Sequence, residues 1–293
     1  MKKLQIKWGI LLALPAIAGF FLWNFGPTVA AIIISFTDWS IAGNPNFVGL
    51  TNYKTIFSDF IFKKSLFVTF YYAIGSTLVG LIAAFFWALL LNSNIPGRSI
   101  FRTIFFIPAV TPAVASAMVW LWLFNPTFGL LNNILKSWGL PTFKWIYDER
   151  QVIPSFILMS VWGIGYTITI FLAGLQGIPQ ELYEAVEIDG GGWWHKLWYI
   201  TVPLMTPIIF FNLIMGLIGA LQAGFAQAYI MTRGGPNYAS MFLTFYIYLN
   251  AFQYGKMGYA CAISVIFFLI ILGLTVLVFR TSPYWVYYEA VKK

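Results

Sequence analysis

Long stretches of the sequence contain no charged residue, and they dominate the pattern of hydrophobic and polar positions. Each of these stretches is long enough to cross the hydrocarbon core of a bilayer as a helix, which takes about 20 apolar residues. A transmembrane barrel would instead alternate polar and apolar residues in segments of about ten. The pattern therefore predicts an all-α, polytopic membrane protein with six transmembrane helices. The six stretches are Trp8–Phe36, Phe67–Leu91, Ile104–Phe124, Val152–Gly174, Leu204–Met231 and Ala260–Phe279.

The composition agrees with this pattern and excludes several classes of protein. Of the 293 residues, 60% are hydrophobic and only 9% are charged, against about 25% charged residues in soluble domains. A soluble enzyme and a disordered chain are both excluded. One cysteine, Cys261, and one histidine, His195, leave no disulfide framework and little room for metal or triad chemistry. We expect residues 1–293 to form a single transmembrane domain.

The first apolar stretch allows two interpretations. Three lysines precede it, and Ala16-Ile17-Ala18 has small residues at the spacing of a signal-peptidase site. However, the apolar run continues without a break to Phe36, which is too long for the apolar region of a signal peptide. We therefore expect a retained first span.

The distribution of positive charge indicates the orientation only weakly. An inward N-terminus puts nine Lys and Arg residues inside and eight outside, although inner loops are normally the richer in positive charge. The short inner segments are more densely charged, since the N-terminal tail and the loop at 92–103 carry Lys2, Lys3, Lys7, Arg98 and Arg102. This predicts that both termini lie on the cytoplasmic side of the membrane. No basic cluster is interleaved with aromatic residues, so a nucleic-acid partner is not expected.

The loop at 175–203, between the fourth and fifth spans, differs from the other loops. Four of the nine acidic residues fall within nine positions, from Glu181 to Asp189. Leu182, Val186 and Ile188 form a rough apolar stripe at helical spacing, and Gly190 is a natural helix stop. Such a short amphipathic element can rest on the membrane surface or dock into a groove on a partner protein, and the pattern alone leaves both possibilities open.

The same loop resembles the EAA loop of the permeases of binding-protein-dependent ABC importers. The family pattern is Glu-Ala-Ala, three residues, Gly, nine residues and Ile-x-Leu-Pro. Here it reads Glu184-Ala185-Val186, three residues, Gly190, nine residues and Ile200-Thr201-Val202-Pro203. Val186 and Val202 are mild departures from the pattern, and the spacing matches throughout.

The resemblance extends along nearly the whole chain. Five further segments are similar to the sugar-uptake permeases of the maltose and glycerol-phosphate type. They are Ser35–Trp39, Phe47–Tyr53, Phe105–Pro108, Leu123–Asn132 and Thr232–Pro236.

The family resemblance implies a type I ABC importer permease fold in a bacterial or archaeal plasma (inner) membrane, and a division of labour between subunits. A second permease subunit, a distinct homologous chain, would complete the pathway, two ATPase subunits would drive it, and an extracytoplasmic solute-binding protein would deliver a sugar. The EAA loop would be the coupling helix, and Glu184, Ala185, Val186, Asp189 and Gly190 would couple it to the ATPase. The sequence has no Gly-rich loop ending in Gly-Lys-Ser or Gly-Lys-Thr. ATP and Mg²⁺ would therefore be bound by the partner, and this chain would bind no cofactor or metal.

The resemblance also points to candidate solute contacts inside the membrane. Counted back from Glu184, Trp162, Gly163 and Tyr166 fall where sugar-contacting positions occur in the maltose-type subunit. On the fifth span, Gln222 and Gln227 place two amides within an apolar stretch. These side chains could bind solute or could pack and bond between helices. A secondary carrier or a membrane enzyme is less compatible with the sequence, because the six stretches hold no ionisable coupling or catalytic groups.

Overall fold

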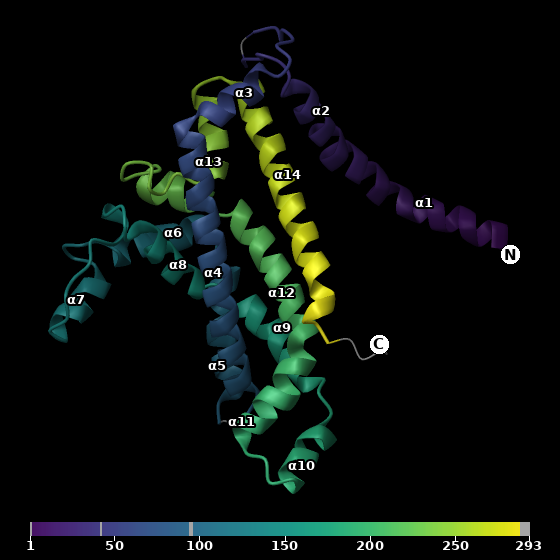
Figure 1. The fold of residues 1–293 in the computed structure, drawn as a ribbon, viewed down its shortest axis with the longest axis vertical. Coiled ribbons are helices and arrows are strands. Elements are labelled where there is room, and N and C mark those ends of the chain that lie inside the picture. Colours follow the sequence, from purple (N-terminus) through teal and green to yellow (C-terminus); the bar gives the residue numbers. More distant parts are fainter. Residues whose placement is uncertain (1, 42, 94–95, 288–293) are drawn as a thin grey trace. The chain divides into compact units, whose positions relative to one another are not determined.

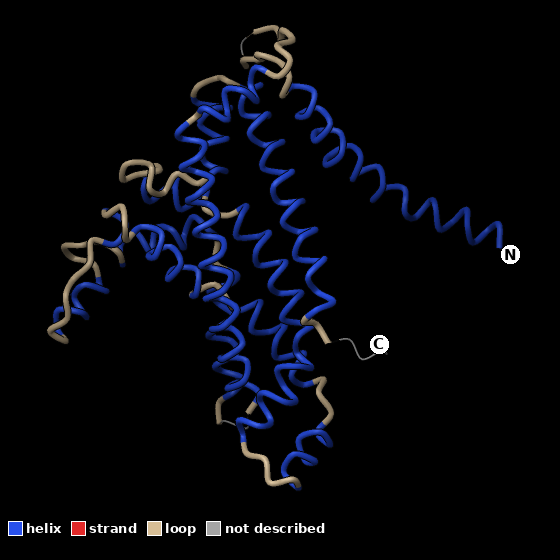
Figure 2. The backbone as a smooth tube through the Cα atoms, in the orientation of Figure 1, coloured by secondary structure: helices blue, strands red, loops and turns tan. Residues whose placement is uncertain are grey.

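The computed structural model describes residues 2–41, 43–93 and 96–287 of the chain, and almost all of their regular structure is helical (Figures 1 and 2). Within these residues the only β-type pairing is an isolated antiparallel bridge between Thr37 and Phe47. Lys292, Lys293 and the side chains of Lys2, Lys3 and Lys7, which entered the charge count, lie outside the described part.

Four helical runs are long and apolar enough to cross a membrane. They are Trp8–Ile34, Phe60–Asn92, Trp193–Thr232 and Met257–Tyr284, and two bent helix pairs bring the number to six if each pair is one span. The α-helices of the runs are α1 (Lys2–Phe20), α2 (Gly26–Ile34), α4 (Phe60–Asn92), α11 (Trp193–Lys196), α12 (Val202–Gln222) and α14 (Met257–Thr281). The remaining α-helices are α3 (Thr51–Ser58), α5 (Arg98–Phe106), α6 (Ala113–Leu123), α7 (Leu130–Ser137), α8 (Val152–Val161), α9 (Gly165–Gln176), α10 (Gln180–Ile188) and α13 (Leu243–Tyr248).

The stretch at 104–124 does not form the single straight helix that its hydrophobicity suggested. Helices α5 and α6 meet at 101°, and the break lies at Thr111 and Pro112. Thr111 has an extended backbone, with ψ of 130°. The proline ring disfavours the helical conformation in the residue before it and removes one backbone donor, so the helix ends there. Helices α8 and α9 meet at 48° across Trp162, Gly163 and Ile164.

Pro27 and Pro203 lie within continuous helical runs, and a π-helical turn precedes each of them. The N–H of Gly26 donates to the carbonyl oxygen of Phe21 just before Pro27. The N–H of Val202 donates to the carbonyl oxygen of Leu197 just before Pro203. In the second case, the segment Trp193–Thr201 extends the predicted span at Leu204–Met231 toward the N-terminus. This segment continues into α12 because the wider turn accommodates the proline without ending the helix.

The chain divides into two compact units. The first comprises Met1–Phe62 and Tyr246–Ile270, and its loops are held by specific backbone contacts. The Asn52 amide donates to the carbonyl oxygens of Ser35 (2.9 Å) and Thr37 (2.8 Å). Gly258 approaches the same loop so closely that a Cβ there would stand 1.9 Å from the Thr37 oxygen. Only glycine fits this position of α14.

The second unit comprises Lys63–Phe245 and Ile271–Lys293. Its main apolar cluster joins α4, α9 and α12 through Ala84, Ala88, Leu91, Ile168, Phe171, Leu172, Leu175 and Met205. Gly174 allows α9 to approach α12, since a Cβ there would stand 2.1 Å from the Ile208 side chain. Small residues at such contacts are typical of helix packing in membranes. That the two units act as one permease domain stays a prediction.

Candidate functional site

Helix α10, Gln180–Ile188, is a short exposed helix at one end of the second unit, and α11 follows it after a tight turn (Figure 1). Pro179 precedes its first turn with a non-helical backbone, φ −59° and ψ 131°, and Glu181 lies in that turn. A carboxylate there interacts favourably with the free N–H groups of the helix start. The sequence therefore determines where the helix begins.

The end of α10 is a Schellman motif. The N–H of Gly191 donates to the Val186 carbonyl oxygen over 2.8 Å, and the N–H of Gly190 donates to that of Glu187 over 3.0 Å. Gly190 has φ of +78°, the left-handed conformation that this motif requires and that glycine adopts without strain. A Cβ on Gly191 would stand 2.5 Å from the Val186 side chain. The glycines therefore fix how the chain turns from α10 into α11.

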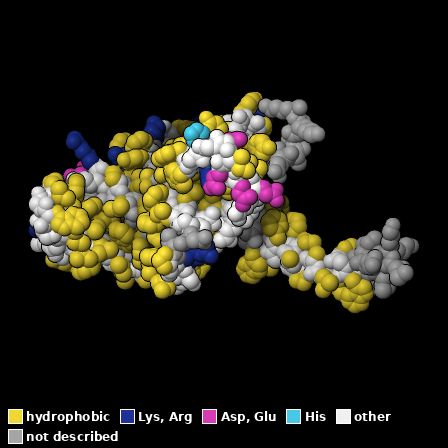
Figure 3. Space-filling model, turned by 90° about the horizontal axis from the view of Figure 1, so that it is seen from below, with side chains coloured by type: hydrophobic (Ala, Val, Ile, Leu, Met, Phe, Trp, Pro, Cys, Tyr) yellow, Lys and Arg dark blue, Asp and Glu magenta, His cyan; other side chains and the backbone are white. Residues whose placement is uncertain are grey.

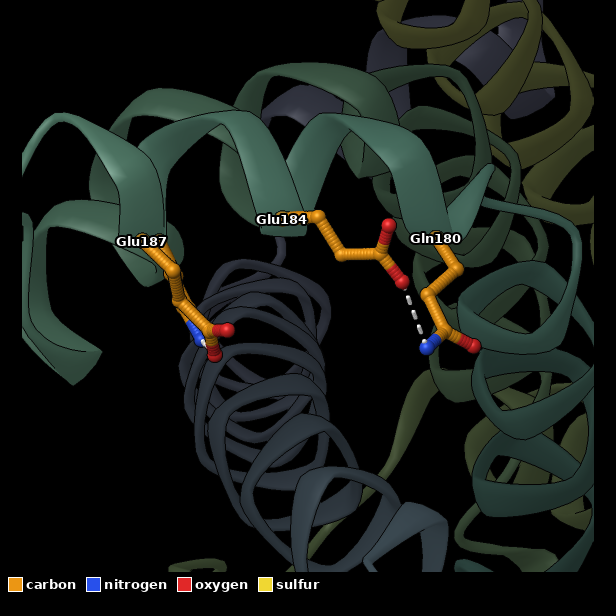
Figure 4. Close-up of polar contacts among 4 residues, drawn as sticks. Gln180, Glu184 and Glu187 are labelled. Carbon is orange, nitrogen blue, oxygen red and sulfur yellow. Dashed lines mark hydrogen bonds and ion pairs between the residues drawn. The ribbon is translucent and has the colours of Figure 1, made fainter.

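Side-chain contacts hold the two arms of this hairpin together. The Lys196 ammonium on α11 forms an ion pair with the Glu187 carboxylate on α10. The hydroxyl groups of Tyr183 and Thr201 lie 3.0 Å apart. On α10 itself, the Gln180 amide donates to the Glu184 carboxylate over 2.9 Å, as Figure 4 shows. The hairpin is therefore a braced unit rather than a free loop.

The outer surface of the hairpin is acidic with exposed apolar positions. Figure 3 shows acidic side chains gathered at this end of the molecule, close to the single histidine. The exposed acids of the hairpin are Glu181, Glu184, Glu187 and Asp189. Ala185 is also exposed, and Ile188 is 86% exposed. The hairpin therefore presents four carboxylates together with exposed apolar positions on one short helix and its turn.

Four of the five predicted coupling residues lie on this exposed hairpin surface. Glu184, Ala185, Asp189 and Gly190 are exposed, whereas Val186 is half-buried. Val186 lies against Gly191 at the base of the turn. Its side chain therefore supports the hairpin from within.

A cavity of about 290 Å³, lined in part by polar side chains, lies within the second unit, among α4, α8, α9 and α12. One side of it carries Ser76, Thr77 and Gly80 on α4, and the other carries Asn212, Gly216 and Gly219 on α12. The Thr77 hydroxyl oxygen is buried with no hydrogen-bond partner among the described residues. The Asn212 amide nitrogen donates to the Ile208 carbonyl oxygen over 3.0 Å, so its own oxygen remains an acceptor.

The predicted solute residues are not brought together at this cavity. Gly163, at the break between α8 and α9, lines it, but the other four do not. The Trp162 ring packs edge-on against Trp120 at 6.2 Å, and the Tyr166 ring packs edge-on against Phe106 at 5.1 Å. Gln222 is the last residue of α12 and is exposed, and Gln227 begins the next helical turn.

Sequence reasoning missed most of the cavity lining, although a signal was present. Ser76, Thr77 and Gly80 recur at helical spacing within a charge-free stretch, and so do Asn212, Gly216 and Gly219. Polar side chains at such positions in transmembrane helices face the protein interior or a water-filled cavity. The resemblance drew attention to aromatic side chains instead.

Comparison with known families decides the identity of the fold. Residues 76–285 match the family described as "Binding-protein-dependent transport system inner membrane component". The chain belongs to this family. It is therefore a multi-pass inner-membrane protein and the permease subunit of a binding-protein-dependent ABC transporter, a transport component rather than an enzyme.

Individual relatives of this permease family match over nearly the full length of the chain. The probable ABC transporter permease protein YesP of Bacillus subtilis (strain 168) is 36% identical over 281 residues, covering 94% of this chain and 90% of the relative. The trehalose/maltose transport system permease protein MalF of Thermococcus litoralis is 32% identical, covering 97% of this chain and 96% of the relative. These relatives confirm the resemblance to sugar-uptake permeases that the sequence motifs indicated.

A solved permease structure confirms the fold class. A chain of the crystal structure of a bacterial alginate ABC transporter, in complex with alginate pentasaccharide-bound periplasmic protein, superposes with a TM-score of 0.84. The overlap covers 96% of each chain at 22% sequence identity. The all-helical ABC importer permease fold expected from the EAA loop is therefore the fold of this chain.

Proposed function

We propose that this permease imports a sugar or oligosaccharide by alternating access, powered by ATP hydrolysis in partner subunits. An extracytoplasmic binding protein delivers the solute, a second permease chain completes the pathway, and two ATPase subunits bind ATP and Mg²⁺. In this proposal the present chain binds neither a cofactor nor a metal. The two compact units act together as one permease domain, with both termini in the cytoplasm.

The observation that carries this proposal is the surface of the α10 hairpin. Glu184, Ala185 and Asp189 are exposed on this surface. The exposed side chain of Ile188, the last residue of α10, lies next to Asp189 in the chain. The ion pair between Glu187 and Lys196 and the Schellman motif at Gly190 make the hairpin stiff enough to transmit force. An exposed, braced helix with an acidic and apolar surface is suited to a groove on a partner protein. We therefore assign Glu184, Ala185, Val186, Asp189 and Gly190 to coupling with the ATPase.

The cavity near Gly163 supports a saccharide as solute. Hydroxyl and amide groups without full complements of partners, such as Thr77 and Asn212, offer hydrogen bonds to sugar hydroxyls at a depth where water is scarce. The name of the trehalose/maltose relative points to the same class of solute. We infer that Gly163 and this cavity form part of the solute site. Trp162, Tyr166, Gln222 and Gln227 remain candidate contacts elsewhere along the pathway.

The test of this function is transport by the assembled complex. The complex is captured through a tag on this chain, reconstituted in vesicles with its binding protein, and supplied with radiolabelled solutes that stabilise that binding protein in a thermal-shift screen. We expect sugar accumulation that requires ATP and the binding protein. Uptake that runs on an ion gradient without ATP, or ATP-driven uptake confined to amino acids, would contradict the proposal.

A cavity-filling substitution tests the solute site directly. Gly219 lines the cavity, and a Cβ there meets no atom within 4 Å, so Gly219→Trp should fill the space without moving the backbone. We expect sugar uptake to fall at least about tenfold, equivalent to about 1.4 kcal/mol, with the melting temperature unchanged. Gly273→Trp on α14 is the matched control, because a Cβ at Gly273 also meets open space and this residue is outside the cavity lining. Equal uptake by both variants would show that solute passes elsewhere.

A further inference from the structure

A second polar cleft, of about 470 Å³, lies entirely within the unit that comprises Met1–Phe62 and Tyr246–Ile270. It shares no residue with the cavity near Gly163. Its walls come from the loop after α2, from helix α3, from Asp59 just before α4, and from the segment between Tyr246 on α13 and Tyr259 on α14. None of the residues assigned to coupling or solute contact lies in it, so the proposed function leaves it unused.

The floor of the cleft is a fixed carboxylate held by two tyrosines. One oxygen of Asp59 accepts the phenolic hydrogens of Tyr246 (2.5 Å) and Tyr259 (2.6 Å). The other oxygen accepts the backbone N–H groups of Ile61 (2.8 Å) and Phe62 (3.2 Å) at the start of α4. A carboxylate has about four acceptor positions, and all of those on Asp59 are occupied. The half-buried Tyr259 has donated its phenolic proton, and its oxygen retains acceptor capacity for a ligand.

The rim of the cleft combines aromatic surface with hydrogen-bonding groups. Tyr254 is 58% exposed, and the indole of Trp39 is half-buried. Lys256 is exposed, and the one ion pair found among the described residues joins Glu187 and Lys196, so the Lys256 ammonium is free to donate. Asp38 accepts hydrogen bonds from the backbone and side chain of Asn46 and keeps acceptor capacity on both oxygens.

The charges of the cleft discriminate between classes of ligand. Hydrogen bonds from Asn46 lower the pKa of Asp38. Burial works to raise the pKa of Asp59, but the hydrogen bonds from Tyr246, Tyr259 and the two backbone groups outweigh it and lower that pKa. Both carboxylates are therefore ionised at neutral pH, against the single positive charge of Lys256. An anion would be repelled, and a metal ion would find the Asp59 oxygens already occupied.

We propose that this cleft is a binding site for an uncharged saccharide unit. The sugar stacks on the rings of both Trp39 and Tyr254, and its hydroxyl groups bond to Asp38, Lys256 and the phenolic oxygen of Tyr259. Aromatic faces with convergent donors and acceptors suit a ring that has apolar C–H faces and a polar edge. The ligand class follows from the cleft itself. That this saccharide is also the transported solute rests on the proposed function.

The test measures protection of a cysteine placed in the cleft. In the complete transporter, reconstituted without its binding protein, Cys261→Ser removes the native thiol and Thr55→Cys places one at the exposed rim. Maltose, trehalose and the neutral solute of the binding protein are the saccharide probes, and sn-glycerol 3-phosphate is the anionic probe. We expect at least one saccharide probe to slow maleimide labelling at least about fivefold at millimolar concentration, with no slowing by the anion.

Matched variants separate binding from folding. Trp39→Ala and Tyr254→Ala should remove the protection, Trp39→Phe should restore part of it, and all three should keep the melting temperature of the parent. Gly219→Trp should keep the protection, because it fills the other cavity. No slowing by any saccharide probe, or equal slowing by sn-glycerol 3-phosphate, would overturn the saccharide site. In a further arm the sugar-free binding protein is added; slowing by that protein together with no slowing by any sugar would overturn the saccharide site in favour of a protein-docking surface.

The outcomes also distinguish this site from the proposed function. ATP-driven sugar uptake without protection of the Thr55→Cys thiol would overturn only the proposal that the cleft binds a saccharide. Protection without ATP-driven uptake would retain the cleft as a saccharide site and overturn the transport proposal.

Discussion

Replacing Gly190 with proline will abolish ATP-driven uptake while the permease still inserts in the membrane. Gly190 has φ of +78° and donates its N–H to the Glu187 carbonyl oxygen. Proline fixes φ near −65° and has no N–H to donate, at a cost of about 3 kcal/mol or more. The Schellman motif cannot form, so α10 and α11 lose their fixed angle. We expect uptake to fall by at least about 100-fold, in line with that cost.

The measurement compares sugar uptake with ATPase activity in the reconstituted complex. Two control variants separate backbone strain from general perturbation of the hairpin. Gly190→Asn should retain most uptake, because asparagine also adopts the left-handed conformation. Gly192→Ala should be neutral, since Gly192 has φ of −83° and a Cβ there meets no atom within 4 Å. Normal uptake by the Gly190→Pro variant would show that the hairpin has no role in coupling.

Replacing Asp59 with leucine will destabilise the permease more than removal of any exposed acid. The substitution deletes four accepted hydrogen bonds and leaves the Tyr246 hydroxyl, on a residue only 6% exposed, without its acceptor. A buried donor that loses its partner costs about 1–3 kcal/mol, and the lost helix cap of α4 adds about 1 kcal/mol. We expect the melting temperature in detergent to fall by roughly 5–10 °C.

The acidity of Asp59 gives this stabilisation a pH dependence. Its pKa lies below the ordinary value of 3.8, so the folded protein keeps this carboxylate ionised after the unfolded chain has taken up a proton. The contribution is fully present above about pH 4 and is lost as the pH falls through the lowered pKa of the folded state. The gap in melting temperature between the parent and Asp59→Leu should therefore be constant from pH 7 to about pH 5 and shrink below about pH 4.

Control variants assign the effect to hydrogen bonding at Asp59. Asp59→Asn keeps one oxygen acceptor and should lose less stability than Asp59→Leu. Asp38→Leu removes an exposed acid whose two bonds go to Asn46 alone and should change the melting temperature little. Equal melting temperatures for Asp59→Leu and Asp38→Leu would show that the tyrosine contacts contribute nothing to stability.

The sequence by itself determined the helices and the family. A bilayer requires long apolar segments whose backbone bonds are satisfied internally, so each charge-free stretch had to be helical. The end of α10 was predictable for a similar reason. The stop at Gly190 depends on hydrogen bonds between residues only three and five positions apart. A glycine after a short apolar stripe is therefore enough to predict it. The Glu-Ala-Val and Gly spacing then pointed to the ABC importer permeases.

Only the tertiary structure decided where polar groups meet. The 101° break between α5 and α6 lies at Pro112 and not at Pro108. The sequence does not distinguish the two prolines, because a membrane span tolerates either one. The cavity that includes Gly163 forms where α4 and α12 turn their polar positions toward the break between α8 and α9. The contacts of Asp59 join it to residues 187 and 200 positions away. Hydrophobicity and helical periodicity act over a few residues, whereas these sites arise from packing between segments that local patterns cannot pair.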